Sequence, residues 1–276
     1  PFDVDKHHEL SRRIATESAV LLKKGNALPA SKTDKVALIG EFAVAPRYQG
    51  AGSSKIDPTH LTSVHDSFET HNINFTYAQG YHSANDTPDP ALINEAVTVA
   101  QGADTVFVLV GLPDSYESEG FDREHINIPE SHNQLVDALV KTGKEIVVIL
   151  NGGSVMALPW RDKVDSILLM NLSGQNSGSA TYDLVFGDVS PSGKLAETYL
   201  LALEDSSSAA HFGGKEAVEY RESIYVGYRY FDKAKKDVMY PFGHGLSYTE
   251  FEYSNLRLNH SEMTPNDTLE ITLTVS

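Results

Sequence analysis

The stretch Asp104-Thr-Val-Phe-Val-Leu-Val-Gly111 decides the fold of this chain, because every side chain from Val106 to Val110 is apolar. Successive side chains of a β-strand point to opposite faces of the sheet. A strand that is apolar at consecutive positions must therefore be covered on both faces, as in the parallel sheets of α/β proteins. The stretch predicts a central, fully buried strand of a parallel sheet.

Segments of the same kind recur along the 276-residue chain and alternate with helical patterns. We expect strands at 35–40, 73–78, 104–110, 145–150 and 165–170. We expect helices at 5–24, around 61–68, and at 90–100, 131–141 and 177–186. This alternation predicts an α/β fold: a mostly parallel sheet covered by helices on both faces, in an α/β sandwich.

The character of the sequence changes after about Pro191, where loop residues and aromatic residues dominate. From Phe251 to Ser276 apolar and polar residues alternate in a β-like manner, as in Leu256-Arg-Leu258. Two lone strands do not form an independent sheet in water. We therefore predict an α/β domain over 1–249 and the incomplete beginning of an all-β domain over 250–276.

The composition excludes several classes of partner and site. A net charge of −16, from 38 acidic and 22 basic residues, disfavours nucleic acid and anionic membranes as partners. The absence of cysteine excludes disulfides, zinc–thiolate sites and thiol nucleophiles. No apolar run approaches the roughly 20 residues of a membrane span, and no signal-peptide pattern opens the chain. A cytoplasmic and a secreted bacterial location both stay open, as does a homo-oligomer.

A carboxylate-rich loop, Tyr116-Glu-Ser-Glu-Gly-Phe-Asp-Arg123, follows the central strand. Ligands meet an open parallel sheet at the carboxyl ends of its strands. Neighbouring carboxylates disfavour each other's ionisation, whereas an arginine lowers the pKa of a carboxyl beside it. The loop therefore predicts differently tuned acids, one of which stays protonated near neutral pH and acts as a general acid. The alternative is a solvated surface turn.

Other motifs give weaker predictions. The stretch Arg47-Tyr-Gln-Gly-Ala-Gly-Ser-Ser54 lacks the glycine spacing of a dinucleotide site and the Gly-Lys-Ser/Thr ending of a P-loop. We interpret it as a loop of close approach that lines a neutral ligand or another domain, with a flavodoxin-like phosphate site as the alternative. Gly152-Gly-Ser154-Val lacks the closing glycine of a nucleophile elbow. His125 and His132 lack the companions of a metal site and are expected to be exposed or capping.

Several segments together resemble one family in the order in which that family has them. The stretch Glu9-Leu-Ser-Arg-Arg-Ile-Ala-Thr-Glu-Ser-Ala-Val-Leu-Leu-Lys23 is similar to the helix that opens the second domain of family 3 glycoside hydrolases. The segments that follow it are similar to further signatures of that family: Val36–Gly40 with Gln49–Ser54, Glu117–Arg123 with Ile128-Pro129, Phe186–Lys194, and Tyr240–Thr249.

The resemblance implies an α/β sandwich domain followed, near Phe251, by the start of a fibronectin-III-like domain. It implies a retaining, exo-acting β-glycosidase, with β-glucosidase as the expected activity and a β-linked glucoside or oligosaccharide as the substrate. In the family the nucleophile is an aspartate on a separate (β/α)8 barrel, which precedes or follows this region in the same parent protein. The family needs no metal or organic cofactor.

The resemblance also assigns roles to residues of the loop. Glu119 is the expected acid/base, because it directly precedes the glycine of the family's Glu-Gly-x-Asp-Arg pattern. Glu117 is the alternative acid, and Asp122 and Arg123 are expected to fix the loop. The chain holds one half of a two-carboxyl site, so we expect it to be inactive by itself. The alternative function is a non-catalytic carbohydrate-binding or assembly domain.

Overall fold

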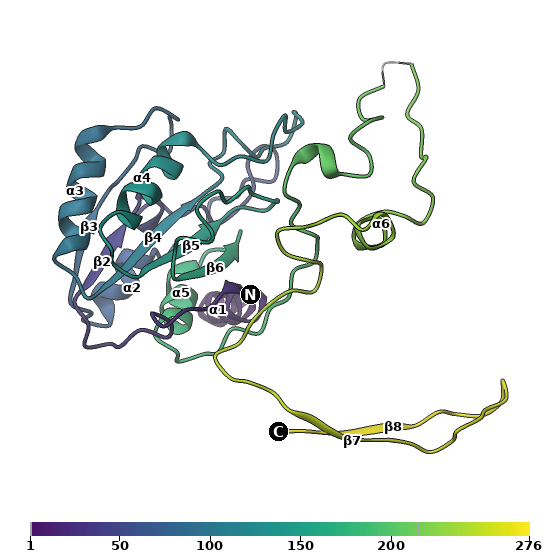
Figure 1. Cartoon of the computed structure of the whole chain (residues 1–276). Coiled ribbons are helices and arrows are strands. Elements are labelled where there is room, and N and C mark those ends of the chain that lie inside the picture. The colour runs from purple at the N-terminus through teal and green to yellow at the C-terminus, as the bar shows by residue number, and fades with distance from the viewer. Residues whose placement is uncertain (1, 215) are drawn as a thin grey trace.

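The computed structural model of the chain describes residues 2–214 and 216–276 and contains a six-stranded sheet (Figure 1). The strands run across the sheet in the order β1-β6-β5-β4-β2-β3, and all are parallel except β1, which is antiparallel to β6. Their bounds are β1 Val20–Lys23, β2 Val36–Ile39, β3 Phe75–Ala78, β4 Thr105–Gly111, β5 Ile146–Asn151 and β6 Ser166–Asn171.

Strand β4 lies in the interior of the sheet between β2 and β5, and every one of its residues is buried. Thr105 of β4 pairs with Val36 of β2, and Val106 of β4 pairs with Ile146 of β5. Strands β2 and β5 are likewise buried throughout. The prediction of a mostly parallel sheet with fully buried central strands is confirmed.

Helices cover both faces of the sheet, as the alternating pattern predicts (Figure 1). Helices α3 and α4 contact each other on one face, and α5 contacts both α1 and α2 on the other. Local signals fix their starts: Ser63 forms a capping box with Asp66 at α2, and Asp89 caps α3. The bounds are α1 Val4–Ser18, α2 Val64–Thr70, α3 Pro90–Gln101, α4 Glu130–Val140 and α5 Ser177–Val185.

The helix predicted over 5–24 is wrong over its last six residues. Helix α1 ends at Ser18, and the next residues form strand β1, in which Val20 pairs with Leu169 of the neighbouring β6. Pairing with the open edge of a sheet outweighs the modest helix propensity of such a segment. Leu10 and Ile14 of α1 stay at the surface, where they are 41% and 56% exposed.

The last third of the chain has little regular structure. It contains the short helices η2 (Leu203–Asp205) and α6 (Tyr228–Ala234), and then the antiparallel pair β7 (Tyr253–Leu258) and β8 (Ile271–Val275). These two strands form a separate small sheet that projects from the α/β body (Figure 1). The boundary near residue 250, and the fibronectin-III-like nature of this sheet, stay predictions. Across the described residues, no helix has the length and apolar character of a membrane span.

The strand order creates a switch point between β2 and β4. After β2 the chain moves outward to β3, then crosses back to β4 on the other side of β2 and continues toward β6. Connections that leave neighbouring strands in opposite directions open a crevice at their carboxyl ends, where ligands bind in open α/β sheets. The two loops that begin there are the Gly-rich loop (residues 47–54) and the acid loop (residues 116–123).

Candidate active site

The acid loop begins on a rigid base at the end of β4. Gly111 donates its backbone N–H to Nδ1 of His132 over 3.2 Å, and Leu112 donates its own to the carbonyl of Asn151 over 2.9 Å. His132 is completely buried and contacts the rings of Tyr81 and Phe42. The expectation of an exposed or capping His132 is therefore wrong: its ring packs in the core and supports the strand end.

Glu117 is held inside the protein. Its carboxylate accepts the N–H of Gly153 at 2.9 Å and the hydroxyl of Ser154 at 2.8 Å, and it lies 3.7 Å from Nη2 of Arg47. The side chain is only 18% exposed. Two hydrogen bonds from the loop after β5 and the ion pair with Arg47 from the loop after β2 hold this carboxylate, so Glu117 occupies a scaffold position between those two loops.

Glu119 is exposed at the apex of the acid loop. Its carboxylate accepts the backbone N–H of Ser53 at 2.9 Å and also the Ser53 hydroxyl, and its own N–H donates to the carbonyl of Ala51. Gly52, between these partners, has φ +95°, and a Cβ there would lie 2.8 Å from Cβ of Glu119. A glycine is therefore needed for the Gly-rich loop to approach the acid loop this closely.

The Ser53 contacts set the charge state of Glu119. The hydroxyl and N–H of Ser53 stabilise the carboxylate and hold the pKa of Glu119 below its ordinary value. In this chain, Glu119 is therefore not the raised-pKa carboxyl that the sequence predicts. The physical reason is that the two donors of Ser53 outweigh the opposing effect of desolvation at this open apex.

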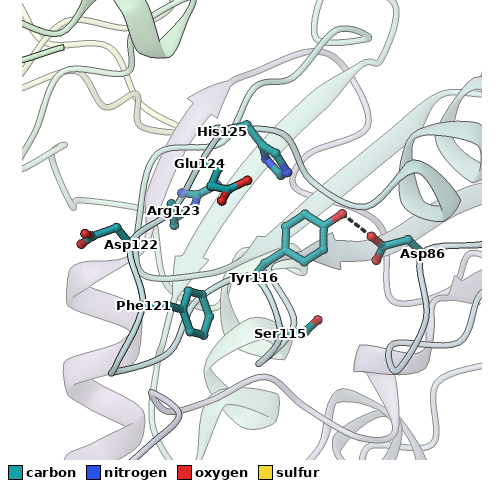
Figure 2. Close-up of a pocket in the computed structure, with 8 residues that line it drawn as sticks. All are labelled: Asp86, Ser115, Tyr116, Phe121, Asp122, Arg123, Glu124 and His125. Carbon is teal, nitrogen blue, oxygen red and sulfur yellow. Dashed lines mark hydrogen bonds between the residues drawn. The ribbon is translucent and has the colours of Figure 1, made fainter. Parts of the chain in front are cut away.

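Asp122 and Arg123 follow the apex and behave differently. Asp122 is exposed, and its carboxylate points away from Tyr116 (Figure 2). Arg123 is half-buried, and its Nη1 donates to the carbonyl of Val155 at 2.7 Å. Burial lowers the pKa of Arg123 from its ordinary value, although Glu117 acts in the opposite direction. Arg123 thus ties the second half of the acid loop to the segment after β5.

A hollow of about 400 Å³ lies beside the acid loop (Figure 2). Across it the Tyr116 hydroxyl donates to Asp86 at 2.5 Å, and burial together with this bond raises the pKa of Tyr116 to about 12. The hollow therefore combines aromatic faces with carboxylates, a chemistry that suits a polyhydroxylated ring. Its lining residues are Asp86, Ser115, Tyr116, Phe121, Asp122, Arg123, Glu124 and His125.

Some of these contacts have no local signal in the sequence. Asp86 belongs to a loop after β3 that carries no motif, and the Gly152-Gly-Ser154-Val motif does not indicate a bond from Ser154 to Glu117. Among the described residues, one group of possible metal ligands lies together: His65, Asp66 and Glu69 on α2. The Asp66 carboxylate there accepts the amide and hydroxyl of Ser63, so Asp66 is part of the capping box of α2.

The fold and the site define a doubly wound α/β domain with a carboxylate-rich loop at its switch point. Residues 19–248 match the sequence model of the glycosyl hydrolase family 3 C-terminal domain. The chain belongs to this family, as the motifs from Glu9 to Thr249 predict.

Known relatives agree with this assignment. The chain is 45% identical over 279 aligned residues to the thermostable beta-glucosidase B of Acetivibrio thermocellus, covering 99% of this chain and 37% of the relative. It is 41% identical to an exo-alpha-(1->6)-L-arabinopyranosidase of Bifidobacterium longum, covering 100% and 38%. The crystal structure of a GH3 beta-glucosidase from Bifidobacterium adolescentis superposes with a TM-score of 0.94 at 43% identity, covering 100% and 40%. The chain thus spans about two fifths of the length of these proteins.

Proposed function

We propose that this chain is the acid/base-bearing part of a retaining, exo-acting β-glycosidase that removes terminal non-reducing β-glucosyl residues. The observation that carries the proposal is the contrast between the two glutamates of the acid loop. Glu117 is bonded into the scaffold by Gly153 and Ser154, whereas Glu119 is exposed at the apex. A proton donor must reach the leaving-group oxygen of a substrate, and of these two glutamates only Glu119 presents its carboxylate at the surface.

The nucleophile of the proposed reaction lies outside this chain. Retaining glycosidases need a second carboxyl about 5–5.5 Å from the acid/base, to form and then release a glycosyl–enzyme intermediate. We assign that role to an aspartate on a (β/α)8 barrel of the same parent protein, which would face the apex of the acid loop. Glu119 then protonates the departing oxygen and afterwards takes a proton from the water that attacks the intermediate.

The lowered pKa of Glu119 in this chain fits a site that is completed by docking. Contact with the barrel would remove water from the apex and bring a second carboxylate close, and both changes raise a carboxyl pKa. The Ser53 bonds would then keep Glu119 from becoming too weak an acid. Relatives named as beta-glucosidases support glucose as the sugar, and the relatives named as arabinopyranosidases supply the competing substrate to test.

The experiment is a substrate panel on the full-length protein that carries this chain, with the isolated chain in parallel. We expect hydrolysis of aryl β-D-glucosides with the β-anomer of glucose as the first product, and no turnover by the isolated chain. Preference for aryl α-L-arabinopyranosides would change the assigned sugar but not the mechanism. Turnover by the isolated chain would refute the two-module site, and sugar binding by an inactive full-length protein would favour a non-catalytic domain.

A further inference from the structure

Arg47 is a buried cation at the switch point of the sheet. It lies in the Gly-rich loop after β2, is only 6% exposed, and comes four positions before the Ala51 carbonyl that meets the acid loop. A guanidinium is expensive to remove from water unless its donors find acceptors. Each of its buried donors therefore needs an acceptor in the neighbouring loops.

The contacts of Arg47 span the crevice from the loop after β2 to the loop after β4. Nε donates to the carbonyl of Leu112 at 2.9 Å, and Nη2 donates to the carbonyl of Glu117 at 3.0 Å. Nη1 donates to the carbonyl of Gln49 and lies 3.0 Å from the carboxylate of Asp114. One rigid fork thus fixes the entry to the acid loop, its first half and the Gly-rich loop together.

Glu117 extends this connection to a third loop. Its carboxylate lies 3.7 Å from Nη2 of Arg47 and accepts hydrogen bonds from Gly153 and Ser154 after β5. Glu119 follows Glu117 by two residues, and its partner Ser53 follows Arg47 by six. The guanidinium therefore contacts both the loop that carries Glu119, through Leu112 and Glu117, and the loop that carries Ser53, through Gln49.

We propose that Arg47 is a positioning residue for Glu119: its fork aligns the two loops so that the apical carboxylate meets the leaving-group oxygen. Arg47 does not touch the reacting atoms. The kinetic consequence rests on the proposed function, whereas the ordering of the acid loop does not. If Arg47 only stabilised the fold, its substitution would lower stability and would reduce the hydrolysis of all substrates to the same degree.

The test variant is Arg47→Lys, which keeps the charge but cannot make the planar, five-donor fork. In the full-length enzyme we expect kcat/KM for substrates with poor leaving groups to fall about 100-fold, since small misplacements of a catalytic group have effects of that size. Activated aryl glycosides, which need little protonation, should fall by less than about threefold.

Arg12→Lys is the matched control. Arg12 also makes a forked pair with a buried carboxylate, Asp183, through two contacts of 2.6 Å that join α1 to α5. Among the described residues, neither partner is hydrogen-bonded to the acid loop. We expect this variant to lose stability to a similar degree and to hydrolyse poor and good leaving groups in the wild-type ratio.

A second readout does not depend on the function. Hydrogen exchange of the amides in residues 117–121 should become at least about tenfold faster in Arg47→Lys, since local opening follows the loss of these contacts. If Arg47→Lys does not fold, Glu117→Gln provides the test, because it keeps an acceptor for Gly153 and removes the charge facing Arg47.

The outcomes separate the two hypotheses. Equal losses for poor and activated leaving groups in Arg47→Lys, or unchanged exchange in the acid loop, would overturn the positioning role. If Glu119→Ala also lowers the rates for poor and activated leaving groups equally, the proposed function is overturned instead. The exchange measurement would still decide whether Arg47 orders the loop.

Discussion

The carboxylate of Glu119 accepts the backbone N–H of Ser53 at 2.9 Å, although 66 residues separate the two in sequence. This bond joins the loops that leave β2 and β4 at the switch point of the sheet. It places an exposed carboxylate on a fixed support, with its charge stabilised by two donors from one residue. The relationship explains both why Glu119 is ordered and why its pKa is low in this chain.

Ser53→Ala should raise the pKa of Glu119 toward the ordinary value of about 4.3. The hydroxyl is lost while the N–H remains, so the rise is partial. Because the pKa of Glu119 is lower in the folded chain, these bonds stabilise the fold above the unfolded pKa and stop doing so as pH falls through the folded value. A carboxyl NMR titration measures the shift, and Ser54→Ala is the control. An unchanged pKa would mean that the hydroxyl does not act on the carboxylate.

Gly52→Ala should push the acid loop away from its support. The new Cβ would lie 2.8 Å from Cβ of Glu119, and φ of +95° strains any L-residue by about 1–3 kcal/mol. Gly143→Ala is the matched control, since φ there is +73° but no atom lies within 4 Å of its Cβ. Urea unfolding should show that both variants are destabilised, while hydrolysis of poor-leaving-group substrates falls only in Gly52→Ala. Equal activities would show that the close approach is not needed.

The sheet could be predicted from the sequence because its strands are buried on both faces. Val106 to Val110 cannot be amphipathic, so their run of apolar residues has one interpretation. The segment Val20–Lys23 has no such signature. It follows α1 after one residue and becomes a strand only because β6 offers an edge, which is a property of the assembled sheet.

The position of the acid loop could also be predicted, but not its contacts. A motif at the end of a strand indicates the carboxyl edge of the sheet. The bonds from Ser53 to Glu119, and from Ser154 to Glu117, join residues far apart in the chain, and each holds a carboxylate in place. The expectation of a raised pKa is wrong for Glu119, because it rests on the neighbouring acids of the loop alone. The donors of Ser53, which lower this pKa, come from another loop.

His132→Asn should reduce the loss of unfolding free energy that occurs as the pH is lowered from 7 to 4. Burial lowers the pKa of His132 to about 3, whereas in the unfolded chain it is about 6.5. Between these values the unfolded chain takes up a proton that the folded chain does not, so stability falls by up to about 1.4 kcal/mol per pH unit as the pH is lowered. Asn offers Gly111 an acceptor and does not titrate. Unfolding free energies from pH 7 to 4 measure the slope; His260→Asn, at an exposed site, should leave it unchanged.

Arg12→Ala should destabilise the packing of α1 on α5 by about 3 kcal/mol, since it leaves the buried carboxylate of Asp183 without its forked partner. Arg13→Ala is the control. Arg13 lies 3.7 Å from Glu17, and both side chains are more than two-thirds exposed, so its loss should change stability by less than about 1 kcal/mol. Chemical denaturation compares the two. Similar small losses would mean that Asp183 is rehydrated when Arg12 is removed.

The identity of the acid/base is tested most directly by the product that Glu119→Ala forms with azide in the full-length enzyme. We expect kcat/KM for poor-leaving-group β-glucosides to fall by about 100-fold or more and that for activated aryl glucosides to be spared. With activated glucosides azide should raise turnover by attacking the glycosyl–enzyme and forming β-glucosyl azide. Glu117→Ala should lose activity through the scaffold, with no azide product. Formation of β-glucosyl azide by Glu117→Ala and not by Glu119→Ala would contradict the assignment of Glu119.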